Sequence, residues 1–149
     1  MGSVARATMP MYPEGPPGFL LVDLGSTSRG HPHTTICIDG SWDARTSLGS
    51  SAWVADPVTG GAPYMQGKRV FAQSALQTEI LACHLALSWA ITRGLTHILI
   101  LTDSTLLIQL LQSVTPRDIS VLHLLREIGA MGGTLRWCRL LKICENVSA

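Results

Sequence analysis

One segment of the sequence, residues 97–102, restricts the fold more than any other. It reads His-Ile-Leu-Ile-Leu-Thr and is followed directly by Asp103. Four consecutive aliphatic residues make both faces of a strand apolar, which is typical of parallel sheets that are buried on both sides. The segment therefore predicts an α/β fold with a central, buried strand at residues 97–102.

A helix is predicted directly before this strand, at residues 74–93. Ser74 is the expected N-cap and Gly94 the expected stop signal. Apolar residues at helical spacing form a stripe along this helix: Leu76, Ile80, Cys83 and Leu87. Glu79 lies beside the stripe and next to small residues, so its carboxylate is expected close to whatever the helix packs on.

The remaining elements follow from alternating patterns and turn residues. The predicted ranges are 34–39, 51–56 and 64–71 for three early strands, 104–112 and 118–130 for two later helices, and 134–143 for a last strand. The resulting order is β-β-β-α-β-α-α-β. This order predicts a mixed five-stranded sheet, in which three antiparallel strands are followed by helix-linked strands, flanked by helices.

Residues 1–33 differ in composition from the rest of the chain. They are rich in Pro, Gly and Ser and have no periodic pattern, which predicts a flexible leader in which only residues 19–22 resemble a short pairing segment. Residues 34–149 are expected to form a single domain. No apolar run near the start has the length of a signal peptide or a membrane span, so we expect an intracellular protein without a membrane segment.

The charge content limits the kinds of function that this chain can have. The net charge is +1 and only 14% of the residues are charged. A protein that binds nucleic acid through a generally basic surface is therefore excluded, and any contacts with nucleic acid must be local.

The four cysteines have neither C-x-x-C spacing nor a histidine at zinc-site spacing, which predicts free thiols in a reducing compartment.

Three carboxylates stand where the predicted elements would bring them together. Asp39 and Asp103 end two predicted strands, and Glu79 lies on the helix between them. If the two strands are parallel neighbours, the three side chains converge, and a hard cation such as Mg²⁺ would relieve their repulsion. Two such ions can clamp an in-line displacement at phosphorus. The same residues also fit a turn, a helix cap and a solvated helix carboxylate, and spacing alone leaves both interpretations open.

Four short strings occur in order along the chain: Ile-Asp-Gly-Ser at 38–41, Gln-Thr-Glu-Ile-Leu-Ala at 77–82, Leu-Ala-Leu-Ser-Trp-Ala at 85–90 and Leu-Thr-Asp-Ser at 101–104. Together they resemble the ribonuclease H family, type 1. The most similar subtype is the reverse-transcriptase-like domain of plant non-LTR retrotransposons. The resemblance covers residues 34–149 and implies the ribonuclease H-like fold.

The resemblance also implies a function for the three carboxylates. They would be both the catalytic residues and the ligands of Mg²⁺, with Mn²⁺ as a substitute. The partner would be an RNA–DNA hybrid, cut in its RNA strand by a monomeric enzyme. Gly40, Ser41 and Ser104 would contact this substrate, because hybrids are recognised by shape and by 2′-hydroxyls across a wide minor groove.

The end of the sequence departs from the family pattern. The family motif Arg-x-x-Asn-x-x-Ala-Asp supplies a fourth carboxylate, but here Ile143 replaces the Arg and the sequence ends at Ala149, before the Asp and the C-terminal helix. Glu145 lies on the wrong side of Asn146 to replace it. The resemblance therefore implies a weakened nuclease. Two alternatives remain: a catalytically silent nucleic-acid-binding module of the same fold, and an α/β interaction domain without a metal site.

Several other residues have structural or functional interpretations. His84 and His123 are interpreted as solvated helix residues. Trp42 is expected to pack over the sheet edge rather than stack on nucleic acid. Three basic residues on or next to the last strand would form either a backbone-binding patch or a solvated edge: Arg136, Arg139 and Lys142.

Overall fold

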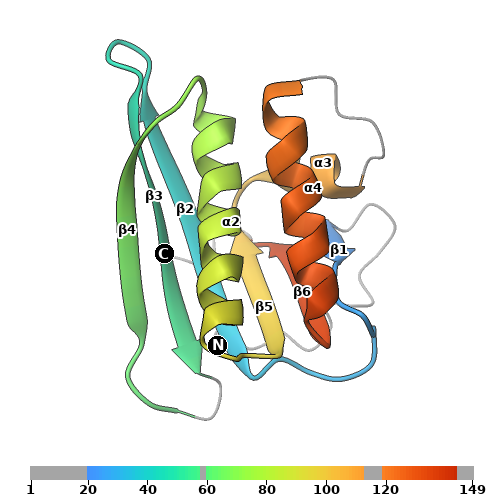
Figure 1. Ribbon diagram of the computed structural model, residues 1–149. Coiled ribbons are helices and arrows are strands. Elements are labelled where there is room, and N and C mark those ends of the chain that lie inside the picture. Colours follow the sequence, from blue (N-terminus) through green and yellow to red (C-terminus); the bar gives the residue numbers. More distant parts are fainter. Residues whose placement is uncertain (1–19, 58–59, 113–118, 144–149) are drawn as a thin grey trace.

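The computed structural model describes residues 20–57, 60–112 and 119–143. Within these residues a mixed six-stranded sheet has the strand order β1-β6-β5-β2-β3-β4. Its helices pack against one face of the sheet (Figure 1). The strands are β1 (Leu21–Asp23), β2 (Thr34–Asp43), β3 (Leu48–Pro57), β4 (Tyr64–Phe71), β5 (His97–Thr102) and β6 (Trp137–Lys142). The helices are α2 (Ala75–Thr92), α3 (Thr105–Gln112) and α4 (Ile119–Thr134).

The pairing of the strands confirms the predicted α/β class. Strands β2, β3 and β4 form an antiparallel meander. Strand β5 lies between β2 and β6 and is parallel to both. All five predicted strands are present in the predicted order, and the sixth strand comes from the leader.

This sixth strand, β1, corrects the prediction of a flexible leader. It pairs antiparallel with β6, and Leu20, Val22 and Leu24 pack against the core. Beyond the strand, the backbone N–H groups of Leu24 and Gly25 both donate to the carbonyl of Cys138, at 2.8 and 3.0 Å. Residues 20–33 therefore belong to the folded domain, whereas residues 1–19 lie outside the described residues, as do Glu145 and the rest of residues 144–149.

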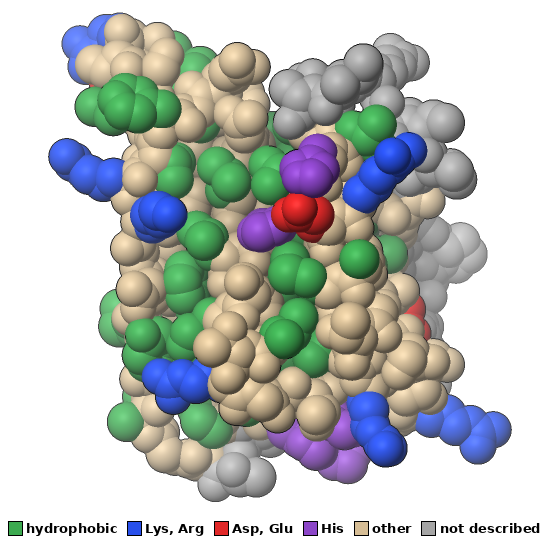
Figure 2. Space-filling view, viewed as in Figure 1, with side chains coloured by type: hydrophobic (Ala, Val, Ile, Leu, Met, Phe, Trp, Pro, Cys, Tyr) green, Lys and Arg blue, Asp and Glu red, His purple; other side chains and the backbone are tan. Residues whose placement is uncertain are grey.

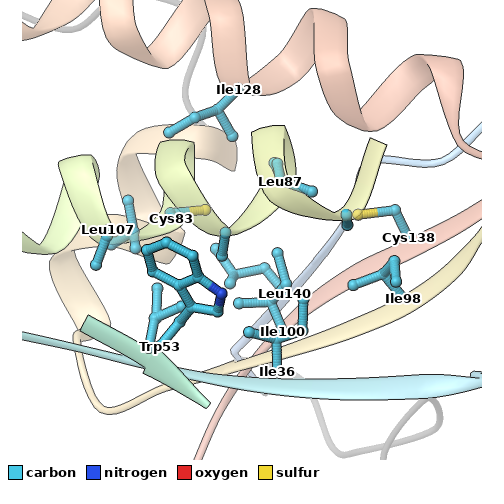
Figure 3. Close-up of a cluster of buried hydrophobic side chains, with 14 of the residues drawn as sticks. Ile36, Trp53, Cys83, Leu87, Ile98, Ile100, Leu107, Ile128, Cys138 and Leu140 are labelled. Carbon is cyan, nitrogen blue, oxygen red and sulfur yellow. The ribbon is translucent and has the colours of Figure 1, made fainter. Parts of the chain in front are cut away.

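The apolar core fills the space between the sheet and the helices, as Figure 3 shows. Ile98 and Ile100 of β5 are fully buried on the helical side, whereas Leu99 is 8% exposed in a second cluster with Trp137 and Leu141. Strand β5 is thus apolar on both faces because both faces are covered. Of the cysteines described, Cys83 and Cys138 are buried free thiols and Cys37 is an exposed one.

The described helices include none that is long and apolar enough to cross a membrane. Helix α2 begins as predicted, since the Ser74 side chain accepts from the backbone N–H of Gln77. Helix α4 extends beyond the predicted end and includes Gly132 and Gly133. A Cβ added to Gly132 would lie 2.6 Å from the Cβ of Leu24, so this glycine permits close packing of α4 on the segment that follows β1.

Candidate metal centre

The sheet places two of the predicted carboxylates side by side. Strands β2 and β5 are parallel, and their paired residues run from Thr34 opposite Ile98 to Cys37 opposite Leu101. The same offset continued by two residues puts Asp39 level with Asp103. In a parallel sheet the carboxyl ends of neighbouring strands open at one edge, where functional groups gather. The strand order thus satisfies the condition on which the sequence-based hypothesis depended.

Strand β2 does not turn at Asp39-Gly40. It continues to Asp43, and the turn follows there, where the Asp43 side chain accepts from the backbone N–H of Arg45 at 2.9 Å and Ser47 has φ 60°. The interpretation of Asp39-Gly40 as turn chemistry is therefore wrong. Asp39 is an exposed residue within a strand and is free of the turn.

Close contact between α2 and the β2–β3 hairpin brings the third carboxylate to the same edge. A Cβ added to Gly40 would lie 2.8 Å from both the backbone nitrogen of Glu79 and the carbonyl carbon of Thr78. Buried Ser51 of β3 donates to the carbonyl of Thr78 at 2.7 Å. Only glycine at position 40 lets the first turns of α2 approach this closely, and the approach places Glu79 over the ends of the strands.

The three side chains converge. One ligand oxygen from each of Asp39, Glu79 and Asp103 lies within 4.8 Å of the other two. Both aspartates are exposed, whereas Glu79 is half-buried, and its Oε1 is buried without a hydrogen-bond partner among the described residues. Two further aspartates of the same hairpin, Asp43 and Asp56, are not members of this group.

The surroundings of Glu79 disfavour its charge. Burial raises the pKa of Glu79 to about 7, and the neighbouring charges of Asp103 and Asp39 add to this effect. A hydrogen bond from the backbone N–H of Gly40 opposes the shift. A group that is crowded by like charges and partly removed from water is stabilised most by a cation.

These residues fit a divalent cation. Carboxylate oxygens are the donors that Mg²⁺ and Mn²⁺ prefer in proteins. Without a cation, the Oε1 atom of Glu79 has no hydrogen-bond partner among the described residues. It then carries the desolvation cost of any buried polar atom that lacks one. The donor set, and not the overall charge of the chain, therefore identifies this edge of the sheet as a candidate metal centre.

The residues predicted to contact substrate have different surroundings. Ser41 is exposed, and its hydroxyl lies 2.8 Å from that of Ser50 on β3. The Ser104 hydroxyl accepts from the backbone N–H of Leu107 at 3.1 Å and so caps the start of α3. Gly40 is held against α2. Gly40 and Ser104 therefore have structural roles. Ser41 has an exposed hydroxyl and lies two residues after Asp39 on β2.

Sequence analysis missed some residues that shape the site and gave others two interpretations. Buried Thr78 and Ser51 join α2 to the β2–β3 hairpin. In the sequence, the small residues near Gly40 are the one sign of this contact. Trp42 donates from Nε1 to the carbonyl of Ala72 at 2.8 Å, which agrees with the packing interpretation. Arg139 is 14% exposed and lies 3.6 Å from Asp23, so it is neither a solvated edge residue nor free for a phosphate.

Comparisons with known proteins agree with this architecture. The structure is similar to RNase H1 from the halophilic archaeon Halobacterium salinarum, with a TM-score of 0.68, 18% identity, and coverage of 76% of this chain and 86% of the archaeal chain. It is also similar to the N-terminal RNase H domain of a Mycobacterium tuberculosis protein, solved as a fusion with maltose binding protein. The TM-score there is 0.68, with 15% identity and coverage of 76% and 83% of the two chains.

Sequence comparison identifies the family directly. No curated protein matches the chain at a significant level of similarity. The model of the family described as reverse transcriptase-like matches residues 37–140, which include all three carboxylates. This match covers more than half of the sequence, and the structural neighbours share its fold. The chain therefore belongs to the reverse transcriptase-like family and has the fold of RNase H.

Proposed function

We propose that the protein is a metal-dependent endonuclease that hydrolyses the RNA strand of RNA–DNA hybrids. The observation that carries this proposal is the convergence of Asp39, Glu79 and Asp103 at the carboxyl edge of the sheet. The family match and the RNase H domains among the structural neighbours support it. The resemblance of the sequence motifs to plant non-LTR retrotransposons further supports a retroelement origin.

The three carboxylates would hold Mg²⁺, with Mn²⁺ as a substitute. The cation supplies Lewis-acid stabilisation of charge on the scissile phosphate and lowers the pKa of a bound water. The protein's own contribution is to hold its ligands before the substrate arrives. Asp39 is fixed by the strand pairing of β2, and Glu79 by the contact between α2 and Gly40. Such preorganisation is effective because the ligands need not reorganise during the reaction.

Recognition of the hybrid would use the edge of β2 beside the carboxylates. The hydroxyls of Ser41 and Ser50, which lie 2.8 Å apart on neighbouring strands, can donate to and accept from 2′-hydroxyls and phosphate oxygens. Gly40 is packed against α2, so its contribution to this surface would be indirect, through the placement of Glu79. The low net charge is compatible with this recognition because these contacts are short-ranged and polar.

The finer features of this proposal are a monomeric enzyme and an intracellular setting. The buried free thiols of Cys83 and Cys138 support a reducing compartment, where thiols persist. A monomer is the simplest state for the site because all three carboxylates come from one chain. Gel filtration of the purified protein would test the monomeric state.

The test is a cleavage assay on an RNA–DNA hybrid labelled in its RNA strand. With Mg²⁺ or Mn²⁺ present we expect cleavage, and Asp39→Asn should lower the rate by about 10²-fold or more, as loss of one electrostatic group commonly does. Asp56→Asn is the matched control, since Asp56 is an exposed strand aspartate outside the group of three.

Three results would contradict the nuclease proposal. Absence of cleavage by the unaltered chain would leave a nucleic-acid-binding module of the same fold, which a binding measurement on the same hybrid would then distinguish from an interaction domain. Cleavage that survives Asp39→Asn would place the activity elsewhere. Equal losses in Asp39→Asn and Asp56→Asn would show a general effect of charge.

A further inference from the structure

A second group of potential ligands lies on the outer face of the helices, away from the carboxylate edge. Glu127 of α4 lies between two histidines: its Oε1 is 2.6 Å from Nε2 of His84 on α2, and its Oε2 is 2.9 Å from Nε2 of His123 on α4. In Figure 2, acidic and histidine side chains lie together on this surface. The interpretation of His84 as solvated is wrong, because its side chain is only 23% exposed and contacts a carboxylate. His123 is 79% exposed, as expected of a solvated helix histidine, although it also contacts Glu127.

Two of these residues have a spacing that suits metal binding. His123 and Glu127 are four residues apart on one helix, so their side chains share a face. The same i, i+4 spacing places two zinc ligands on one helix in the H-E-x-x-H arrangement. His84 comes from a neighbouring helix that packs against α4, and it is only 23% exposed, so its ring has little freedom. His84, a ligand with little freedom on α2, therefore faces the pair His123 and Glu127 on α4.

We propose that His84, His123 and Glu127 form a binding site for a zinc-class divalent metal ion that joins α2 to α4. Two imidazoles and a carboxylate are a donor set that proteins use for zinc. Imidazole favours zinc, copper and nickel over magnesium, so this site and the carboxylate centre would select different metals. The proposal does not depend on the nuclease function.

The geometry shows how the ion would enter. At present the Glu127 carboxylate accepts from both rings, and the hydrogen bond from His84 is the largest reason that the pKa of Glu127 lies below its ordinary value. An ion would displace the proton between His84 and Glu127 to solvent, and the two side chains, now 2.6 Å apart, would move apart to hold the ion at about 2.0–2.1 Å from the nitrogen. The His123 side chain is 79% exposed, so it can rotate to supply the third ligand. Water completes the coordination.

Such an ion would support the carboxylate centre from a distance. His84 lies on α2 about one and a half turns after Glu79, since a helix has 3.6 residues per turn. A link between α2 and α4 at this point resists separation of the two helices. The ion would therefore stabilise the position of α2 and, through it, the placement of Glu79 over the strands.

The test is calorimetric titration of the full-length protein with Zn²⁺ in excess Mg²⁺, which would compete with Zn²⁺ for the carboxylate centre. We expect one equivalent of Zn²⁺ to bind, in the unaltered chain and equally in Asp39→Asn. His123→Gln should weaken binding by at least about tenfold, because even indirect partners of a metal ligand commonly cost that much. His31→Gln, an exposed histidine elsewhere, should leave binding unchanged.

A second measurement separates metal binding from the hydrogen bonds already present. Saturating Zn²⁺ should raise the melting temperature of the unaltered protein, because a ligand that binds only the native state stabilises it. The rise should be smaller in His123→Gln at the same Zn²⁺ concentration, because weaker binding stabilises the native state less, and the exposed position of His123 makes a folding defect unimportant. Absence of Zn²⁺ binding, loss of binding in Asp39→Asn, or unchanged binding in His123→Gln would each overturn the proposal.

Discussion

Glu79 is a carboxylate in surroundings that oppose its ionisation. It is half-buried, its Oε1 has no partner among the described residues, and Asp39 and Asp103 lie close by. Among the described residues, the backbone N–H of Gly40 is the group that stabilises its charge. Without a bound cation, ionised Glu79 therefore works against folding. Functional sites often retain residues that are unfavourable for stability, because the same arrangement binds a ligand.

This arrangement predicts a pH-dependent stability in the absence of divalent cations. The pKa of Glu79 rises from its ordinary value of 4.5 to about 7 in the folded protein. Unfolding then releases a proton between these two values, so this residue makes stability fall as pH rises through that window. Glu79→Gln removes the cost. At pH 8 the variant should be more stable by about 1 kcal/mol, a value reduced for the solvent screening of a half-exposed group.

Thermal unfolding in a chelating buffer, at pH 8 and at pH 4, measures this effect. Near pH 4 both states are protonated, and the variant and the unaltered protein should agree. Added Mg²⁺ should reverse the order at pH 8, since only the unaltered protein keeps all three ligands. A variant that is less stable than the unaltered protein at pH 8 without metal would show that Glu79 is not held against its charge.

Gly40 offers a second prediction at this scale. An added Cβ would meet backbone atoms of Thr78 and Glu79 at 2.8 Å, and backbone cannot move aside cheaply. Gly40→Ala should therefore cost about 1–3 kcal/mol of stability, as overpacking commonly does, and should displace Glu79. Urea denaturation measures the cost.

Gly129 provides the matched control for Gly40. It lies within α4, and an added Cβ would have nothing within 4 Å. Gly129→Ala should stabilise the protein by about 0.5–1 kcal/mol, because alanine loses less backbone entropy on folding. Equal effects of the two substitutions would contradict the close contact between β2 and α2.

The candidate site could be predicted from the sequence to the extent that its residues adjoin apolar segments. Asp39 follows the apolar residues of β2, Asp103 follows β5, and Glu79 lies beside an apolar helical stripe, so periodicity locates all three. Their assignment as catalytic residues stays a prediction. Thr78 could not be predicted as part of the site, because its burial depends on two glycines of a hairpin that is distant in sequence.

At the scale of elements, β1 shows what local patterns fail to reveal. It has three residues, and its neighbours are Pro, Gly and Ser, so composition suggested a flexible leader. Its stability comes from β6, more than a hundred residues later, through strand pairing and an ion pair of Asp23 with Arg139. The predicted end of α4 was wrong for a related reason, since Gly132 is needed for contact with Leu24 and does not stop the helix.

Deletion of this segment should therefore destabilise the domain. A chain that begins at residue 34 loses the pairing of β1 and the packing of Leu20, Val22 and Leu24. Compared with a chain that begins at residue 20, we expect a loss of at least about 3 kcal/mol, because removal of a single buried aliphatic side chain commonly costs about 2–5 kcal/mol. Urea denaturation of the two chains measures the difference. Equal midpoints would restore the interpretation of residues 20–33 as a leader.

At the scale of the whole molecule, strand order turns three separate acidic residues into one site. Strand β5 is predictable because it is apolar on both faces. Its parallel neighbour β2 is harder to predict, because β3, β4 and α2 lie between the two strands in the sequence. The register that places Asp39 level with Asp103 is set by pairing across the sheet. From the sequence, the site could be proposed only on the condition that the two strands are parallel neighbours. The structure satisfies this condition.

The central claim is that these three carboxylates form one divalent cation centre. Crystals soaked in Mn²⁺ measure this directly, because the anomalous signal of manganese locates the ion and Mn²⁺ accepts the same oxygen ligands as Mg²⁺. We predict an anomalous difference peak bounded by oxygens of Asp39, Glu79 and Asp103, and its loss in Asp39→Asn. Crystals with ordered carboxylates and no peak among them, or a peak that remains in Asp39→Asn, would contradict the account.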